Sequence, residues 1–103
     1  MISTHILDLS TGQPAAGVQV MLEKDGAPLK AEATNADGRI SFQVAPAPGV
    51  YRLTFAVADY ARRQGMVPFF LDVPITFEVT DTSRRYHVPL LLSPYGFSTY
   101  RGS

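Results

Sequence analysis

The strongest pattern in the chain covers residues 86–100 and does most to constrain the fold. Two runs rich in valine, leucine, tyrosine and phenylalanine flank the tetrapeptide Ser93-Pro94-Tyr95-Gly96. Apolar, branched and aromatic side chains favour strands, whereas proline and glycine interrupt strands at turns. We therefore predict a closing β-hairpin, with strands over residues 86–92 and 97–100.

The first strand of this hairpin divides its side chains between two faces. Because side chains alternate along a strand, the even positions from Tyr86 to Leu92 share one apolar face. His87, Pro89 and Leu91 share the other face, so the histidine lies outside the apolar row. On the second strand, the same alternation separates positions 98 and 100 from positions 97 and 99.

A polar tail, Arg101-Gly102-Ser103, follows the hairpin directly. Chain ends are usually poorly ordered and tolerant of change. A guanidinium, a hydroxyl and a terminal carboxylate at the end of a strong strand instead indicate that this segment is used.

Short alternating stretches also fill the rest of the chain. They predict strands over residues 2–8, 18–23, 29–34, 40–44, 50–55 and 75–79, separated by turns such as Asp25-Gly26 and Asn35-Ala36-Asp37-Gly38. One short helix is predicted over residues 58–64, with Asp59 near its start and Gly65 as its terminator. The whole chain, 1–103, is then a single all-β domain, an antiparallel eight-stranded β-sandwich with one short helix.

The remaining residues receive structural predictions. In the first strand, Ile2, Thr4 and Ile6 share one face, and Ser3, His5 and Leu7 share the other. We expect a core role for Met66, Phe69 and Phe70, turn or cap roles for Asp8, Asp37 and Asp59, and a solvated position for Arg84-Arg85.

Composition argues against several functions. Lysine and arginine together number nine, as do aspartate and glutamate, so the formal net charge is zero and neither nucleic acid nor a membrane surface is an expected partner. The chain has no cysteine and two histidines, too few for a thiolate or three-histidine zinc site within one subunit. We expect no cofactor. Without a secretory signal or a membrane-spanning run, a cytoplasmic location is expected.

The chain resembles the transthyretin family over essentially its whole length. Its first half is similar to the general prealbumin-like sandwich in the segments Asp8-Leu9-Ser10-Thr11-Gly12-Gln13-Pro14 and Thr34-Asn35-Ala36-Asp37-Gly38-Arg39. Many structural and adhesive modules share that turn chemistry. The second half is more specific: Tyr86-His87-Val88-Pro89-Leu90-Leu91-Leu92-Ser93-Pro94-Tyr95-Gly96 and Tyr100-Arg101-Gly102-Ser103 resemble the signature of the 5-hydroxyisourate hydrolases, the enzyme branch of the family.

This resemblance implies a set of site residues. The implied catalytic residues are His5, Arg39, His87 and Ser103. The implied substrate-binding residues are His5, Arg39, Tyr100, Arg101 and Gly102. The family also implies a homotetramer, a dimer of dimers, with a central channel lined by the first strand and the last hairpin, and with sites at the subunit interface.

The implied reaction is the hydrolysis of 5-hydroxyisourate to 2-oxo-4-hydroxy-4-carboxy-5-ureidoimidazoline in urate catabolism. A neutral imidazole, with an ordinary pKa of about 6.5, can take a proton from water near neutral pH. We assign this base role to the pair His5 and His87 without choosing between them. Arg39 offers a planar fork of donors to ring carbonyls or to a developing oxyanion, and Tyr100 and the backbone around Gly102 would hold the ring.

Each of these residues taken alone has a simpler interpretation. A strand histidine is usually a surface or core polar group, an arginine after an Asp-Gly turn is usually solvated, and Tyr100 alone would be a packing residue. Two other functions therefore remain open. A transthyretin-like small-molecule carrier would use the same channel without a base, and a non-enzymatic prealbumin-like structural module would need only the first-half pattern. The carrier branch resembles this chain at Ser93-Pro94-Tyr95 but lacks both histidines and the Arg-Gly-Ser end, so the polar set favours the enzyme.

Overall fold

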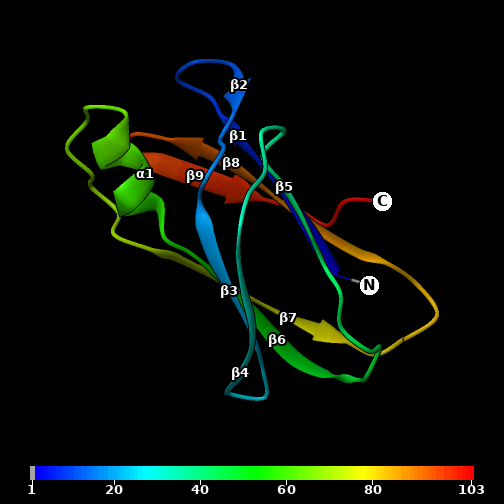
Figure 1. Ribbon diagram of the computed structural model, residues 1–103. Coiled ribbons are helices and arrows are strands. Elements are labelled where there is room, and N and C mark those ends of the chain that lie inside the picture. The colour runs from blue at the N-terminus through cyan, green and yellow to red at the C-terminus, as the bar shows by residue number, and fades with distance from the viewer. Residues whose placement is uncertain (1) are drawn as a thin grey trace.

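The computed structural model describes residues 2–103 as two β-sheets that enclose a common core (Figure 1). One sheet contains β1 (Ile2–Asp8), β2 (Gln13–Pro14), β5 (Arg39–Phe42), β8 (Tyr86–Ser93) and β9 (Gly96–Thr99). The other contains β3 (Gln19–Lys24), β4 (Ala27–Ala33), β6 (Gly49–Phe55) and β7 (Val73–Val79). The helix α1 (Val57–Arg63) lies between β6 and β7 in the chain. The predicted all-β sandwich with one short helix is confirmed.

Two features of the first sheet differ from the prediction. Its order is β2-β1-β8-β9, with β5 also paired to β1, and β1 runs parallel to β8 rather than antiparallel. A parallel pair needs a long crossover, and here the entire second sheet lies in the chain between the two strands. In addition, β2 forms a ninth strand within the predicted loop, where Gln13 pairs with Asp8.

The core follows the alternation predicted for the strands. On β1, the even positions from Ile2 to Asp8 are buried and the odd positions are half-buried. On β8, Val88, Leu90 and Leu92 are buried and His87 is half-buried on the opposite face, where Pro89 is also buried. The predicted alternation of burial is confirmed for β1 and, apart from Pro89, for β8.

The segment after the helix departs from the prediction at two residues. Met66, predicted to be a core residue, is half-buried and is not part of the core. Phe70 packs against the core, as expected, but Phe69 is 66% exposed. Phe69 instead lies edge-on to the ring of Phe70, with centroids 4.9 Å apart, and near the ring of Tyr95, at 6.4 Å. The prediction that Phe69 is a core residue was wrong, because its neighbour Phe70 already fills the inward position.

The turn and helix signals are located close to where they were predicted. Asp25 and Gly26 both have positive φ, of 50° and 84°, as a tight hairpin turn between β3 and β4 requires. The helix begins one residue before the predicted start, and Gly65 just beyond it has φ of 76°. Among residues 2–103, no helix is long and apolar enough to cross a membrane.

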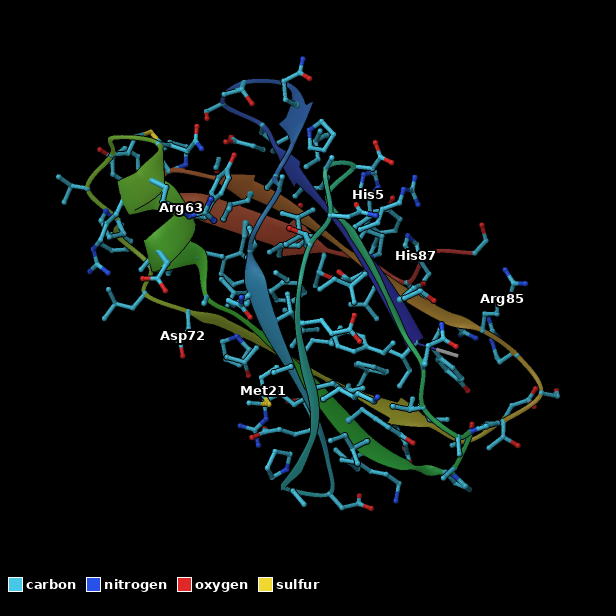
Figure 2. The ribbon with its side chains drawn as sticks, in the orientation of Figure 1. His5, Met21, Arg63, Asp72, Arg85 and His87 are labelled. Atoms are coloured by element: carbon cyan, nitrogen blue, oxygen red, sulfur yellow. The ribbon has the colours of Figure 1, made fainter. Side chains whose placement is uncertain are left out.

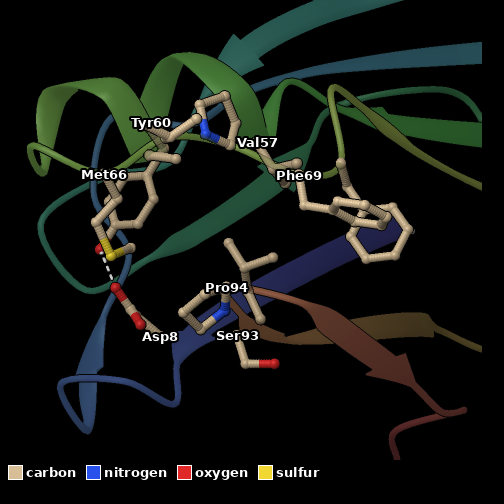
Figure 3. A pocket seen from close by; sticks show the side chains of 12 residues that line it. Asp8, Val57, Tyr60, Met66, Phe69, Ser93 and Pro94 are labelled. Atoms are coloured by element: carbon tan, nitrogen blue, oxygen red, sulfur yellow. Dashed lines mark hydrogen bonds between the residues drawn. The ribbon is translucent and has the colours of Figure 1, made fainter.

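A buried hydrogen bond attaches α1 to the end of β1. The Tyr60 hydroxyl donates to one oxygen of Asp8 at 2.7 Å (Figure 3). The backbone N–H and hydroxyl of Ser10 donate to the other oxygen at 2.9 and 2.6 Å. Burial raises the pKa of Asp8, but these hydrogen bonds outweigh it and keep the pKa below its usual value. Burial and then the bond to Asp8 raise the pKa of Tyr60 to about 12. Asp8 is thus a turn residue, as predicted, and also a buried acceptor for the helix.

We predict that Tyr60→Phe lowers the free energy of unfolding by about 1.5–3 kcal/mol near neutral pH, because it removes a hydrogen bond to a buried carboxylate. Asp8 has a folded pKa below its usual value of 3.8, so its ionised form stabilises the fold above that value. This contribution is lost as the pH falls through the folded pKa. Urea unfolding should therefore show that the difference in free energy of unfolding between wild type and Tyr60→Phe becomes smaller as the pH is lowered.

Tyr51→Phe is the matched control for this prediction. The Tyr51 hydroxyl donates to the backbone carbonyl of Ala47 at 2.7 Å, an acceptor that does not titrate. Removal of this hydroxyl should lower the free energy of unfolding by the same amount at neutral pH and at about pH 3. If the loss of free energy changed with pH in the same way in Tyr51→Phe and Tyr60→Phe, the role given to Asp8 would be contradicted.

Candidate active site

Three adjacent strands bring the predicted site residues to one face of the first sheet. The central strand, β1, places His5 opposite Arg39 of β5 and places Ser3 opposite His87 of β8. Directly paired residues share a face, and so do residues two apart on one strand. His5, Arg39 and His87 therefore share a face, although they come from distant parts of the chain.

A cleft of about 430 Å³ opens on this face. Arg39, Arg85, His87 and Ser103 contribute to its wall, together with Ser3 and Ser41. Figure 2 shows His5, His87 and Arg85 on one side of the molecule, away from Arg63 of α1. Two guanidinium groups line the cleft, together with Ser103, whose terminal carboxylate is the one negative group among the lining residues. The guanidinium groups can donate hydrogen bonds to a ligand rich in carbonyl groups.

His87 occupies an environment that favours its neutral form. Burial first, and then the positive charge of Arg39 and the nearby His5, lower the pKa of His87 below its usual value of 6.5. Its Nδ1 lies 2.8 Å from the Ser3 hydroxyl oxygen. Near neutral pH the ring is thus uncharged and can accept a proton.

The chain returns to β8 in its last residues. The N–H of Gly102 donates to the His87 carbonyl at 2.8 Å, which forms an isolated antiparallel bridge, and Gly102 is buried. This bridge brings Ser103 to the cleft that Arg39 and His87 line. The tail is therefore fixed at the site by a backbone contact.

Two of the predicted substrate-binding residues lie elsewhere. Tyr100 and Arg101 line a second hollow of about 340 Å³, on the side of His87 that faces β7. Tyr100 is 58% exposed there. Within this chain, the structure brings Arg39, His87 and Ser103 to one cleft with His5 alongside, and it does not bring Tyr100 and Arg101 to that cleft.

Sequence reasoning missed several residues of the cleft, and two of them lie close to a predicted site residue. Ser3 contacts His87, and Arg85, predicted to be an ordinary solvated residue, is exposed but also lines the cleft wall. The alternation of side chains contained the signal for both. Ser3 is two residues before His5, and Arg85 is two residues before His87, so each shares a face with a predicted site residue.

Comparison with known proteins places this geometry in a family. Residues 2–102 match the model of the HIUase/Transthyretin family. The 5-hydroxyisourate hydrolase of Salmonella typhimurium is 46% identical over 110 residues, which span 100% of this chain and 81% of that protein. The 5-hydroxyisourate hydrolase of Mesorhizobium japonicum is 49% identical over 114 residues, with 99% and 91% covered.

Solved structures from both branches of the family share the fold. The 5-hydroxyisourate hydrolase of Klebsiella pneumoniae superposes with a TM-score of 0.91 at 44% identity, covering 99% of this chain and 98% of that one. Transthyretin from Sparus aurata superposes with a TM-score of 0.91 at 27% identity, covering 98% and 95%. The sequence match and the shared sandwich agree: this chain belongs to the HIUase/Transthyretin family.

Proposed function

We propose that this protein hydrolyses 5-hydroxyisourate to 2-oxo-4-hydroxy-4-carboxy-5-ureidoimidazoline in urate catabolism. The observation that carries the proposal is full-length identity of 46–49% to proteins named 5-hydroxyisourate hydrolase. Identity to the transthyretin from Sparus aurata is 27% with equal structural similarity, so the fold alone does not separate an enzyme from a carrier. The polar residues on the outer face of β1, β5 and β8 support the enzyme.

The proposed mechanism uses the residues of the cleft. A water molecule attacks a ring carbonyl, and its proton passes to an imidazole of the His5 and His87 pair. The lowered pKa of His87 supports this role because it keeps the ring unprotonated near neutral pH. Arg39 donates hydrogen bonds to the carbonyl oxygen as it becomes negative. The C–N bond then breaks, and the proton moves from the imidazole to the leaving nitrogen.

The subunit arrangement is part of the proposal. We expect a homotetramer, a dimer of dimers, whose sites lie at the subunit interface. Leu7 and Leu91 stay half-buried on the same face as the imidazoles, so this face carries apolar surface that is available for a partner. Tyr100 and Arg101 would then meet a substrate through the neighbouring subunit. A cytoplasmic location and a single domain remain predictions.

The histidines are tested by substitution. His5→Asn and His87→Asn should each lower turnover by roughly 100-fold or more, the range expected when a general base is removed. The assay is the decay of freshly generated 5-hydroxyisourate in the ultraviolet, with thermal melting to show that each variant is folded. Because the folded pKa of His87 lies below its usual 6.5, the rate should fall only as the pH drops below about that value. Near-normal turnover in both variants would remove the catalytic assignment.

Arg39 is tested by separating its charge from its geometry. Arg39→Lys keeps the charge but loses the two parallel donors, so kcat/KM should fall although the acid limb of the pH profile stays in place. Arg39→Gln also removes the charge that lowers the pKa of His87, so the acid limb should move to higher pH. Arg52→Lys, on the other sheet where Arg52 pairs with Glu23 at 3.2 Å, should change neither quantity. An unchanged kcat/KM in Arg39→Lys would make Arg39 an ordinary surface arginine.

The tail is tested by truncation. Removal of residues 101–103 takes away one backbone bridge and no apolar side chain, so the fold should lose little. Hydrolysis should be abolished, because alignment of substrate and donors can supply several kcal/mol of a barrier. A tag fused after Ser103 should also reduce activity, whereas an N-terminal tag should be tolerated. A folded truncated protein, by size exclusion and melting, that turns over normally would exclude the tail from the mechanism.

A further inference from the structure

Two groups lie against the imidazole ring of His87, one on each side of Cγ, the atom through which the ring is attached. On one side, the Ser3 hydroxyl oxygen lies 2.8 Å from Nδ1. On the other side lies the backbone of Gly102, so close that a Cβ built on this glycine would be 2.6 Å from Cδ2 and 3.2 Å from Cγ of the ring. The part of the ring farthest from both contacts is the tip formed by Cε1 and Nε2. These contacts restrict rotation of the ring in both directions.

Gly102 is required at this position for space rather than for backbone conformation. It is not among the glycines with φ in the left-handed region. Its N–H is bonded to the carbonyl of His87 itself at 2.8 Å, which holds the two residues together. A side chain of any size at position 102 would therefore displace either the ring or the end of the chain.

The position of Ser3 is set by the sheet. The parallel register of β1 and β8 places Ser3 directly opposite His87, and both residues are half-buried. A hydroxyl can donate to Nδ1 or accept from it, so the distance alone leaves two tautomers of a neutral ring. In one tautomer Nε2 carries a lone pair, and in the other it carries the proton.

The proposed base role distinguishes the two tautomers. Ser3 lies against Nδ1, so Nε2, at the tip of the ring away from both contacts, is the nitrogen left to meet a water molecule. A base needs a lone pair on the nitrogen that meets the water. The proton then belongs on Nδ1, where Ser3 accepts it.

We propose that Ser3 and Gly102 are positioning residues for His87. The Ser3 hydroxyl accepts a hydrogen bond from Nδ1–H and so fixes the tautomer in which Nε2 carries the lone pair. Gly102 provides the space in which the ring lies. The base role of the ring rests on the proposed function. In that reaction, Nε2 takes a proton from water as the hydroxide adds to the carbonyl carbon, and it returns the proton to the leaving nitrogen while Nδ1–H stays bonded to Ser3.

Other charged and titratable groups surround the ring and contribute to its titration. Those that pair with its neighbours or line the two hollows beside it are His5 on β1, Arg39 on β5, Glu78 on β7, Arg85 before β8, Tyr86 at its start, and Tyr100, Arg101 and the terminal carboxylate of Ser103 at the end of the chain. The test therefore uses the tautomer as its first readout, because the tautomer is measured on the neutral ring alone.

The tautomer is measured by nitrogen NMR of the ¹⁵N-histidine-labelled protein at a pH above the titration of His87, with assignment by comparison with His87→Asn. We expect a protonated Nδ1 and an unprotonated Nε2 in wild type, and an averaged signal from both tautomers in Ser3→Ala. Ser41→Ala is the matched control, because Ser41 lies opposite Ser3 on β5 and lines the same cleft. Its His87 tautomer should match wild type. A protonated Nε2 in wild type, or an unchanged tautomer in Ser3→Ala, would overturn the role of Ser3.

Kinetics provide the second readout for Ser3. Ser3→Ala should lower kcat by about 10- to 100-fold with little change in KM, because the base is present but is not held in one tautomer and orientation. Ser3→Thr keeps the hydroxyl and should retain most of the wild-type kcat. Equal losses in the alanine and threonine variants would indicate a packing role and overturn the proposal.

Gly102→Ala tests the other contact against Gly96→Ala. A Cβ at Gly96 would meet only the Ser93 hydroxyl oxygen at 3.6 Å, an ordinary contact, so this control should melt like wild type and keep its activity. Gly102→Ala should lose at least tenfold in kcat and shift the ring signals of His87 while remaining folded. Wild-type kcat and ring signals in Gly102→Ala would overturn the role of Gly102. If wild type does not hydrolyse 5-hydroxyisourate, the proposed function fails, whereas the NMR measurement still decides whether the two contacts fix the ring.

Discussion

The parallel pairing of β1 with β8 is the constraint on which the rest of the structure depends. The pairing is continuous from Ile2 opposite Tyr86 to Asp8 opposite Leu92. Towards the core, Ile6 and Leu90 are fully buried, and the Thr4 hydroxyl donates to the Val88 carbonyl at 2.6 Å. On the outer face of the sheet, the same register places Ser3 directly opposite His87. A slip of one residue would turn the polar face into the core and the apolar face outwards, so the register that closes the core also determines the site.

Local sequence patterns correctly predicted the structural features that depend only on residues close together in the chain. The alternating faces of β1 and β8, the positive φ values of the Asp25-Gly26 turn and the terminating role of Gly65 all follow from short-range chemistry. The direction of the β1 and β8 pair did not follow, because these strands are joined by the whole second sheet and a strand pattern is the same in either direction. Phe69 and Phe70 likewise have the same side chain, and only the filled core decides which one points outward.

The candidate site, like the fold, could be predicted from the sequence only in part. His5 and His87 lie outside the apolar rows of their strands and were predicted as site residues from the resemblance to the 5-hydroxyisourate hydrolases, and the structure places both on the outer face of one sheet. Ser3 and Arg85 were missed, although each lies two residues from one of these histidines, because alternation shows which residues share a face but does not show which of them contact a residue of a neighbouring strand. The course of the tail was also not predictable, since a single bridge between Gly102 and His87 decides that Ser103 reaches the cleft and Tyr100 does not.

Along β1, the even positions point into the core and stabilise the fold, whereas the odd positions lie on the face that carries the candidate site. The even positions end at Asp8, whose carboxylate accepts the hydrogen bond of Tyr60 and so connects the core to α1. The odd positions carry Ser3, which lines the cleft, and His5, which lies alongside it, and both are half-buried. Substitutions on the odd positions can therefore change the ligand or the reaction without a large loss of folding energy. The solved hydrolase and the solved transthyretin have equal structural similarity to this chain, although their identity to it is 44% and 27%. Similarity of this kind is expected where the buried positions keep the fold and the outward-facing positions are free to change.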